Sequence, residues 1–299
     1  MKQYKTLSLF DGISCGRLAL AKAGIVTSAY DAYEIDDIAI QISKNNCIDV
    51  NHFGSVVGAD FRKHAPDLIL AGFPCQDLSI SKANRAGLKG ARSGLFWELV
   101  RAIEETAPEY FLIENNWKMP KEDEETISET LGVTPLLINS SCFSAQSRNR
   151  LYWTNIPVDM SLLPADSGLC VENILFTGKH TEKNLFKEVK FNGKEDEVFY
   201  HDKTCRIGTI GKGGQGERVY SIYGKSCTLT ANGGGRGAKT GLYLTDDMEV
   251  RKLLPIEAER LQCLPDNYTQ GFTDNQRLKA INNGWTVDVI SFILGFLPR

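Results

Sequence analysis

The order of elements at the start of the chain limits the possible folds most strongly. The apolar run TLSLF (6–10) predicts a buried strand, and a loop with two glycines leads into a helix over residues 17–24. SAYDAYEID (28–36) predicts a second strand. A strand, a glycine loop, a helix and a second strand in this order are typical of the doubly wound α/β folds, in which helices cover a mostly parallel sheet.

This alternation continues through the first half of the chain and stops near Ile156 and Pro157. The further predicted strands are 67–72, 109–115, 134–141 and 151–155, and the predicted helices are 95–107, 121–131, 255–264 and 287–297. The last of these is apolar on every side, so we expect it to return to the core of the first domain.

Glu34 lies at the end of the second predicted strand, 18 residues after Gly16. This is close to the spacing at which nucleotide-binding folds place an acid on the ribose hydroxyls. The full G-x-G-x-x-G pattern is absent, so no pyrophosphate need be bound. A nucleoside cofactor without phosphates, such as S-adenosylmethionine, fits such a loop.

Cys75 directly follows Pro74, just after the strand predicted over 67–72. Proline lacks an N–H and ends strand pairing, so the cysteine is presented where open α/β sheets hold their ligands. A single cysteine is most often a small buried apolar residue. Its polar neighbours, and a basic loop that runs to Gly94, instead favour a reactive thiolate. Cys75 is therefore a candidate nucleophile.

Polar residues mark two further strand ends. Glu114 lies at the end of the strand predicted over 109–115, and two arginines, Arg148 and Arg150, precede the strand at 151–155. Side chains alternate along an extended chain, so Arg148, Arg150 and Tyr152 are expected on one face. Two cations on one side suit a binding site, and surface solubility is the alternative.

Residues 157–250 differ in composition from the rest. Eleven of the 27 glycines lie between Gly208 and Gly241, among short Thr-, Tyr- and Leu-containing strands. Residues 203–239 carry seven lysines and arginines against one acid, although the whole chain has a net charge of −3. The aromatic and β-branched residues favour a small ordered domain over a flexible linker. The local positive charge is typical of a surface that binds a polyanion.

Composition argues against several other classes of protein. The chain is 42% hydrophobic and 24% charged, as soluble globular proteins are. It has neither an apolar run long enough for a membrane span nor a signal-peptide pattern, so we expect a cytoplasmic protein without membrane contact. The eight cysteines form no C-x-x-C pair, so neither a metal site nor a disulfide framework is expected.

Six segments together resemble the blocks of the C5-cytosine DNA methyltransferase family. In order, they are FDGISCG (10–16), GFPCQDLS (72–79), LIENN (112–116), QSRNR (146–150), RLQCLPDNY (260–268) and NNGWTVDV (282–289). The resemblance covers nearly the whole chain. Within the insert, residues 211–221 and 228–244 resemble the recognition segment of the bacterial enzyme that methylates GCGC. FDGIS, YWTNIP and NGWTVDV are more similar to the mammalian de novo enzymes.

The resemblance implies a reaction and a role for each catalytic residue. Addition of a thiolate to C6 of cytosine activates C5 to attack the methyl group of S-adenosylmethionine. Cys75 would be the nucleophile, and Glu114 would bond N3 and the exocyclic amine. Arg150 would bind O2, and Arg148 would contact Glu114 or a phosphate. The cytosine would be flipped out of the duplex.

The resemblance also implies two sets of binding residues. The cofactor set is Phe10, Asp11, Gly12, Ile13, Glu34, Ile35, Leu95, Asn283 and Trp285. The DNA set is Ser81, Gln215, Arg218, Thr228 and Gly235. Within the DNA set, Gln215 and Ser81 would fill the space left by the flipped base. Arg218 would pair bidentately with a guanine, which implies a short G/C-rich palindrome such as GCGC.

Some positions depart from the family pattern. Asn282 stands where glycine is common, Asn116 replaces a valine, and Ser55 stands where an aspartate usually holds the adenine amine. Asn232 and Arg236 differ from the GCGC enzyme. These departures concern cofactor affinity and target sequence more than the reaction.

We therefore expect an α/β protein with a Rossmann-like S-adenosylmethionine-dependent catalytic domain (1–156 and 251–299). A small, glycine-rich, mostly β target-recognition domain (157–250) is expected to accompany it. The expected partner is double-stranded DNA, bound by a monomer in a bacterial or phage-infected cell, in a restriction-modification setting. Two alternatives stay open. One is a tRNA cytosine-5 methyltransferase of the same fold, although its Cys-Phe-Thr signature is not found. The other is a catalytically idle DNA-binding protein, which Cys75, Glu114 and Arg150 do not support.

Overall fold

The computed structural model describes residues 2–74, 87–90, 93–193 and 203–299. The predicted nucleophile Cys75, the predicted DNA contact Ser81 and most of the basic loop that follows Cys75 lie outside the described residues. The chain divides into two compact units. The first is Met1–Ile138, Asn149–Ser161 and Val289–Arg299, and the second is Asn139–Arg148 and Leu162–Asp288.

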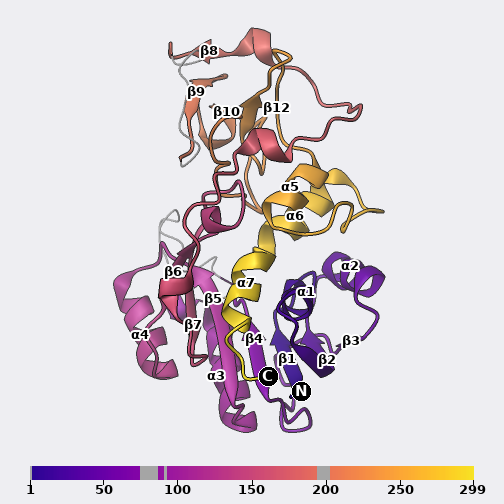
Figure 1. Ribbon diagram of the computed structural model, residues 1–299, viewed down its shortest axis with the longest axis vertical. Helices are drawn as coiled ribbons and strands as arrows, with labels where there is room; N and C mark the ends of the chain where they lie inside the picture. The colour runs from indigo at the N-terminus through magenta and orange to yellow at the C-terminus, as the bar shows by residue number, and fades with distance from the viewer. Residues whose placement is uncertain (1, 75–86, 91–92, 194–202) are drawn as a thin grey trace. The chain divides into compact units, whose positions relative to one another are not determined.

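The first unit is built on a seven-stranded sheet with the strand order β3-β2-β1-β4-β5-β7-β6 (Figure 1). The strands are β1 (Gln3–Leu9), β2 (Val26–Tyr33), β3 (Val50–His52), β4 (Leu68–Ala71), β5 (Tyr110–Asn116), β6 (Leu136–Asn139) and β7 (Asn149–Thr154). β1 to β5 pair in parallel, and β7 is antiparallel to β5. Chain order reverses between β1 and β4, and open α/β sheets bind their ligands at such a switch point.

The connections supply the helices α1 (Cys15–Lys22), α2 (Asp37–Asn46), α3 (Phe96–Thr106) and α4 (Lys121–Leu131). The short polar helix predicted near 121–131 is confirmed. The sequence prediction missed α2 and β3, which are short and polar. A start signal for α2 was present, because the side chain of Asp36 accepts from the backbone N–H groups of Ile38 and Ala39.

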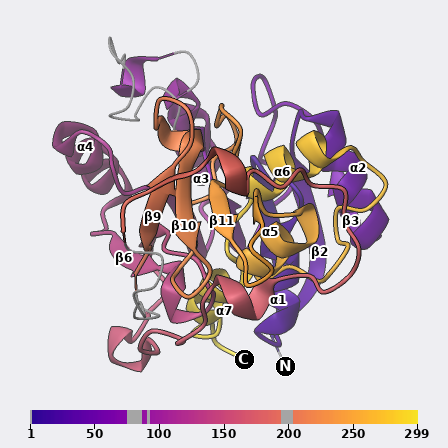
Figure 2. The ribbon, with the colours of Figure 1, turned by 90° about the horizontal axis from the view of Figure 1, so that it is seen from above.

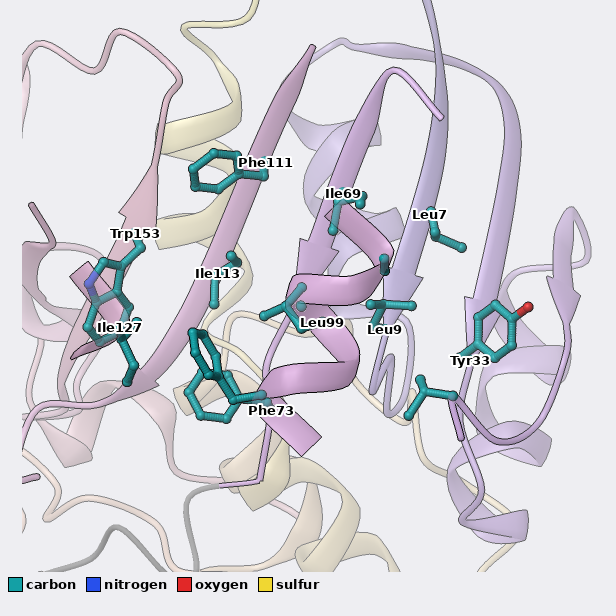
Figure 3. Packing of buried hydrophobic residues seen from close by; sticks show 14 of the residues in the cluster. Leu7, Leu9, Tyr33, Ile69, Phe73, Leu99, Phe111, Ile113, Ile127 and Trp153 are labelled. Carbon is teal, nitrogen blue, oxygen red and sulfur yellow. The ribbon is translucent and has the colours of Figure 1, made fainter. Parts of the chain in front are cut away.

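One face of the sheet packs against α3 and α4 (Figure 3). Its side chains come from alternate strand positions, among them Leu7, Leu9, Ile69, Phe111, Ile113 and Trp153, and they meet Phe96 and Leu99 of α3 and Ile127 of α4. Leu68, Leu70 and Leu112, at the intervening positions, are also fully buried. The central strands are therefore covered on both faces, which explains their nearly continuous apolar sequence.

The second unit contains a five-stranded sheet with the order β12-β11-β10-β9-β8, and Figure 2 shows β9, β10 and β11 side by side. The strands are β8 (Lys190–Phe191), β9 (Arg206–Thr209), β10 (Arg218–Ser221), β11 (Leu242–Leu244) and β12 (Val250–Arg251). β10 and β11 are parallel, and the other pairs are antiparallel. Ile207, Ile210, Val219, Leu242 and Val250 form its buried core. The prediction of an ordered, mostly β unit in this region is confirmed.

The helices α5 (Pro255–Leu261) and α6 (Asp274–Asn283) also belong to the second unit. From the sequence we expect residues 251–299 in the catalytic domain, and the functional boundaries at 157 and 250 stay a prediction. α7 (Val287–Leu294) spans the division between the units, and its residues from Val289 onward belong to the first unit. Ile290, Ile293 and Leu294 are fully buried, so its predicted return to that core is confirmed.

Within the described part of the chain, every helix is too short or too polar to cross a membrane.

Candidate active site

Three neighbouring strands, β1, β2 and β4, end at one level, and Glu114 lies at the same level near the end of β5. The strand registers pair Leu9 with both Tyr33 and Ala71, and Ala71 in turn with Ile113. The next residue along each chain is therefore Phe10, Glu34, Gly72 or Glu114. Because these strands are parallel, all four lie at the carboxyl edge of the sheet, at the switch point. The structure thus brings together the strand ends that the sequence predicted.

The loop after β1 has an unusual backbone. Phe10, Gly12 and Ser14 all have positive φ angles, of 58°, 60° and 60°. Non-glycine residues adopt this conformation rarely and at a cost, and they persist where surrounding contacts hold them. The carboxylate of Asp11 supplies such contacts, since it accepts hydrogen bonds from the hydroxyls of Ser8, Ser14 and Tyr30 at 2.6, 2.5 and 2.7 Å. These contacts give Asp11 a role in shaping the loop, and its contact with a cofactor stays a prediction.

Glu34 ties the loop after β1 to the end of β2. Its Oε2 accepts from the Gly12 N–H at 2.8 Å, and its Oε1 accepts from the N–H groups of Ile35 and Asp36 at 2.7 and 2.8 Å. The carboxylate is therefore held in one orientation before any ligand arrives. Ile35, the next residue, is 73% exposed, which leaves an apolar surface beside this carboxylate.

A buried polar network holds the last residues of β2 in place. His64 Nδ1 lies 2.7 Å from Asp31 Oδ2, and His64 Nε2 lies 2.9 Å from the Tyr33 hydroxyl. Burial raises the pKa of Tyr33, so its hydroxyl stays protonated and can donate to Nε2. In the tautomer in which Nε2 accepts from Tyr33, Nδ1 carries the proton and donates to Asp31. This network holds the residue that directly precedes Glu34.

Glu114 and Arg150 form an ion pair, with Nε and Oε1 2.8 Å apart. The register explains the contact: Glu114 pairs with Tyr152, so Arg150 lies diagonally opposite on the same face. Of the three residues predicted to share a face, Arg150 and Tyr152 do so, whereas Arg148 precedes β7 and belongs to the second unit, so its part of the prediction stays untested. The exposed fractions of the two paired side chains are only 14% for Arg150 and 12% for Glu114. A largely buried carboxylate and guanidinium therefore stand at the carboxyl end of β5.

Asn115 holds the chain that leads into Cys75. Its Nδ2 donates to the backbone oxygen of Phe73 at 3.0 Å, and the residue is buried. Phe73 is itself a member of the core cluster. Cys75 lies outside the described residues, but Phe73, two positions before it, is anchored to the strand that carries Glu114. Sequence reasoning assigned Asn115 no role, although its place beside Glu114 was a signal.

The remaining predicted cofactor residues fall into both units. Ile13 is buried, and Leu95 is half-buried against the core of the first unit. Asn283 ends α6 in the second unit and is exposed, and Trp285, two residues later, is half-buried. Arg148 also belongs to the second unit, where its Nη2 donates to the Gly284 oxygen at 3.2 Å. Their predicted roles stay predictions.

The glycines of the second unit let two loops approach backbone to backbone. The Gly237 N–H donates to the Gly216 oxygen at 2.6 Å. A Cβ on Gly216 would lie 1.8 Å from the Gly234 oxygen, so no other residue fits there. We expected these glycines to permit close approach to a ligand, and at Gly216 and Gly237 the neighbour is instead the other loop.

The predicted DNA residues of this unit lie on or beside these loops. Gln215 is exposed at the start of a single 3-10 turn, and Gly235 has φ 81°. Arg218 begins β10, and its Nε is buried without a hydrogen-bond partner among the described residues. Thr228 donates from Oγ1 to the Ser147 oxygen at 2.7 Å, so this hydroxyl has a structural contact.

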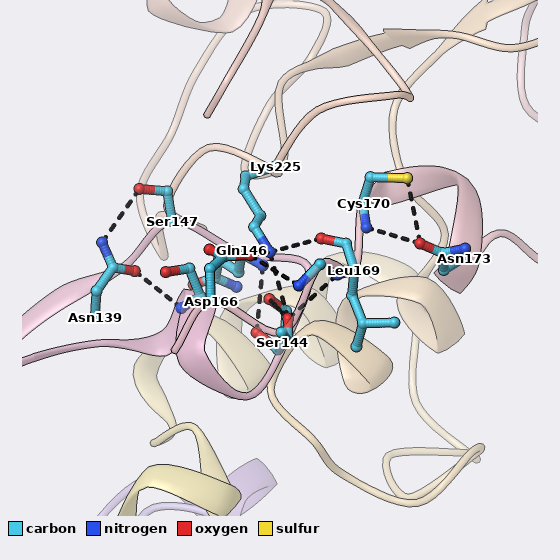
Figure 4. A network of polar contacts seen from close by, with 12 residues as sticks. Asn139, Ser144, Gln146, Ser147, Asp166, Leu169, Cys170, Asn173 and Lys225 are labelled. Atoms are coloured by element: carbon cyan, nitrogen blue, oxygen red, sulfur yellow. Dashed lines mark hydrogen bonds and ion pairs between the residues drawn. The ribbon is translucent and has the colours of Figure 1, made fainter. Parts of the chain in front are cut away.

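Lys225, one of the seven basic residues counted within 203–239, does not lie on the surface (Figure 4). It is fully buried, its Nζ lies 2.7 Å from Asp166 Oδ1, and it donates to the Leu169 oxygen at 2.7 Å. Burial acts to raise the pKa of Asp166, but the Lys225 contact and the hydrogen bonds from Gly168 and Ser141 together outweigh it and hold that pKa below its usual value. Lys225 is therefore a structural cation, and counting it toward a polyanion-binding surface was wrong.

Comparisons with known proteins identify the family of the chain. The model of the C-5 cytosine-specific DNA methylase family matches residues 4–298. The Type II methyltransferase M.HhaI of Haemophilus parahaemolyticus is 29% identical over 308 residues, which cover 96% of this chain and 92% of the relative. The orphan methyltransferase M.SPRI of Bacillus phage SPR is 30% identical over 335 residues, which cover 94% of this chain and 75% of the relative.

Solved structures share the fold at low sequence identity. The Dnmt2 methyltransferase of S. pombe superimposes with a TM-score of 0.72 and 17% identity, over 98% of each chain. The methyltransferase EhMeth of Entamoeba histolytica gives a TM-score of 0.73 and 17% identity, over 99% of this chain and 98% of that one. With the family match over nearly the full length, the chain belongs to the C-5 cytosine-specific DNA methylase family and is a DNA cytosine-5 methyltransferase.

Proposed function

We propose that this enzyme takes a cytosine out of duplex DNA and transfers a methyl group from S-adenosylmethionine to its C5, at a short G/C-rich palindrome such as GCGC. The observation that supports this most directly is the buried Glu114–Arg150 pair at the carboxyl edge of the sheet. Asn115, next to Glu114, holds the backbone of Phe73, and Cys75 follows two residues later.

The pair complements the polar edge of cytosine. The exocyclic amine of the base is a donor, and a carboxylate at Glu114 accepts from it. Glu114 can also hold a proton toward N3 as charge builds on the ring. Arg150 uses Nε and Nη1 in its described contacts, and a guanidinium has five N–H donors, so donors remain for O2.

Cys75 would act on the base held in this way. Its thiolate adds to C6, and the ring then becomes nucleophilic at C5. After transfer, the C5 proton leaves to a base and the thiolate is expelled from C6, which restores the aromatic ring and the free enzyme. A flipped base is required, because C5 and C6 are out of reach within a stacked duplex.

The loops after β1 and β2 fit S-adenosylmethionine. Glu34 presents a preoriented carboxylate for the ribose hydroxyls, the exposed Ile35 offers an apolar contact for adenine, and a Cβ placed on Gly12 would meet no atom within 4 Å. The bound cofactor supplies an electrophilic methyl group. Phe10, Asp11, Ile13 and Leu95 would line or shape this site, and Asn283 and Trp285 would complete it.

Replacing Glu34 with alanine should weaken cofactor binding by about 1–3 kcal/mol, because the ribose hydroxyls lose their acceptor. Isothermal titration with S-adenosylhomocysteine measures this directly. Asp37→Ala is the matched control, since Asp37 is an exposed acid three residues further on. Equal binding by Glu34→Ala and wild type would refute the assignment. Binding of NAD in place of S-adenosylhomocysteine would overturn the choice of cofactor.

The target sequence rests on residues 157–250, which we propose as the target-recognition domain of a monomer acting on double-stranded DNA. Gln215 is exposed at the start of a 3-10 turn and would fill the place of the flipped base together with Ser81. Arg218, three residues later, has a buried Nε without a partner among the described residues. A guanidinium pairs bidentately with O6 and N7 of guanine. Thr228 and the backbone at Gly235 would assist.

Arg218→Ala should relax the preference for a guanine beside the methylated cytosine, by about 1–3 kcal/mol of discrimination. Lys212→Ala, which removes an exposed cation six residues earlier, should weaken binding evenly across sequences and reduce its salt dependence. Bisulfite sequencing of a plasmid methylated by each variant gives the sequence context. Wild-type methylation spread over contexts without a neighbouring guanine would contradict the proposed site.

The proposal as a whole is tested by incubating the protein with labelled S-adenosylmethionine and either duplex DNA or tRNA. Label in duplex DNA is expected. Label in tRNA alone would favour the tRNA methyltransferase alternative. Tight binding of duplex DNA without any transfer would indicate a catalytically idle protein.

A further inference from the structure

Asn282 makes a buried contact between α6 and the loop that contains Thr230. It lies in the last turn of α6 and is 4% exposed. Its Nδ2 donates to the backbone oxygen of Thr230 at 3.1 Å. Its Oδ1 is buried and has no hydrogen-bond partner among the described residues. A buried acceptor without a donor costs free energy, so stability alone is a poor reason for an asparagine here.

The turn after Asn282 is held from two sides within the same unit. Gln262 donates from Nε2 to the Ile281 and Gly284 oxygens, both at 3.1 Å, and its Oε1 accepts from the Thr286 hydroxyl at 2.8 Å. Arg148 adds a second donor to the Gly284 oxygen. These hydrogen bonds tie the turn over residues 281–286 to Gln262 and Arg148. It carries Asn283 and Trp285, which the proposed function places on the cofactor.

The loop that contains Thr230 is fixed in a similar way. The Thr230 N–H donates to the Lys239 oxygen at 3.0 Å, which closes the loop over residues 230–239. Thr228 donates to the Ser147 oxygen, and the Ser147 N–H donates to the Ser226 oxygen at 3.0 Å. This loop carries Gly235 and follows Thr228, both of which the proposed function places on DNA.

We propose that Asn282 is a positioning residue that couples DNA binding to cofactor binding. DNA that binds the loop favours one position of the Thr230 oxygen, and through Asn282 it favours one position of the turn that carries Asn283 and Trp285. When the turn already lies where it binds the cofactor, cofactor binding costs less free energy, so the two ligands bind with positive cooperativity. The inference rests on the proposed function for the identity of both ligands.

The test is a thermodynamic cycle with two ligands, S-adenosylhomocysteine and an unmethylated duplex that carries the sequence on which the protein acts. Calorimetry gives the dissociation constant of S-adenosylhomocysteine without DNA and with saturating DNA. For the wild type we expect the duplex to tighten binding by a factor within the 5- to 150-fold range common for coupled sites. Asn282→Ala should bind S-adenosylhomocysteine alone with close to wild-type affinity and lose most of that tightening.

Asn275→Ala is the matched control, because Asn275 is an exposed asparagine on the same helix. It should keep the full coupling. Asn282→Leu keeps most of the size and removes the N–H donor together with the buried oxygen that has no partner among the described residues, so it tests the bond to Thr230 if Asn282→Ala unfolds. Melting temperatures of all variants report any loss of fold.

The outcomes separate this inference from the function on which it rests. A wild type that binds neither S-adenosylhomocysteine nor DNA would refute the proposed function. A wild type that binds both ligands without coupling would overturn the inference alone. It would likewise be overturned by variants of Asn282 that keep the coupling, or that lose affinity for S-adenosylhomocysteine equally with and without DNA.

Discussion

Cys75→Ser is expected to abolish methyl transfer, with a loss of about 10⁴-fold or more, because the nucleophile acts as a unit with the residues that bind the base. A serine hydroxyl is almost never ionised at neutral pH, whereas a cysteine thiol near positive charge often is. The substitution exchanges one atom after a strand, β4, whose four residues are all buried. DNA and cofactor binding should therefore remain close to wild type. Single-turnover transfer from labelled cofactor measures the loss.

A mechanism-based trap identifies the attacking atom. A duplex with 5-fluorocytosine at the target should form an adduct that survives denaturation, since fluorine cannot leave C5 as the proton does. Cys142→Ser is the matched control, because burial raises the pKa of the Cys142 thiol and keeps it protonated. It should trap and transfer like the wild type. Methylation without any trapped adduct, or methyl transfer by Cys75→Ser at the wild-type rate, would refute the covalent mechanism.

The sequence predicted which residues lie at the carboxyl edge of the sheet in the first unit, because the signals for strand ends are local. An apolar run that ends in a polar residue marks both a strand and its carboxyl end, as at Glu34 and Glu114. In a parallel sheet these ends fall on one edge, so strand ends alone brought the candidate residues together. The strand order and the level registers at Leu9, Tyr33, Ala71 and Ile113 then confirmed the arrangement.

Short polar elements gave weaker signals. α6 was missed because its sequence DNQRLKAINN is mostly polar. A capping box at Thr273 and Gln276 was nevertheless present, with the Thr273 hydroxyl accepting from the Gln276 N–H. The missed helix mattered for function, because its end carries Asn282 and Asn283.

Other features could not be predicted because they depend on contacts between distant parts of the chain. Lys225 looks like any exposed lysine in sequence, and only the fold buries it against Asp166, which lies 59 residues earlier. The glycine-rich loops suggested a ligand site, yet Gly216 is required by the backbone of Gly234. The bond between Asn282 and Thr230 joins positions 52 residues apart. No periodicity or local motif encodes such pairs.

Glu114→Gln is expected to lower kcat by about 10² to 10⁴-fold, the usual contribution of a positioned acid or base. The amide keeps the size of the side chain but cannot hold a transferable proton toward N3. It also leaves Arg150, whose side chain is only 14% exposed, without its carboxylate. Affinity for S-adenosylhomocysteine should stay near wild type, because Glu34 and Ile35 lie on a different strand end. Single-turnover rates and calorimetry separate these two effects.

Glu109→Gln is the control for this change. Glu109 directly precedes β5, five residues before Glu114, but its side chain is 51% exposed and pairs with Lys2 at the surface. The same chemical change there should leave kcat unaltered, since surface ion pairs contribute at most about 1 kcal/mol. A melting temperature for each variant shows whether Glu114→Gln has lost its fold rather than its chemistry. If folded Glu114→Gln keeps more than about a tenth of the wild-type kcat, Glu114 supplies less than the usual share of an acid or base, and the proton must come from another group.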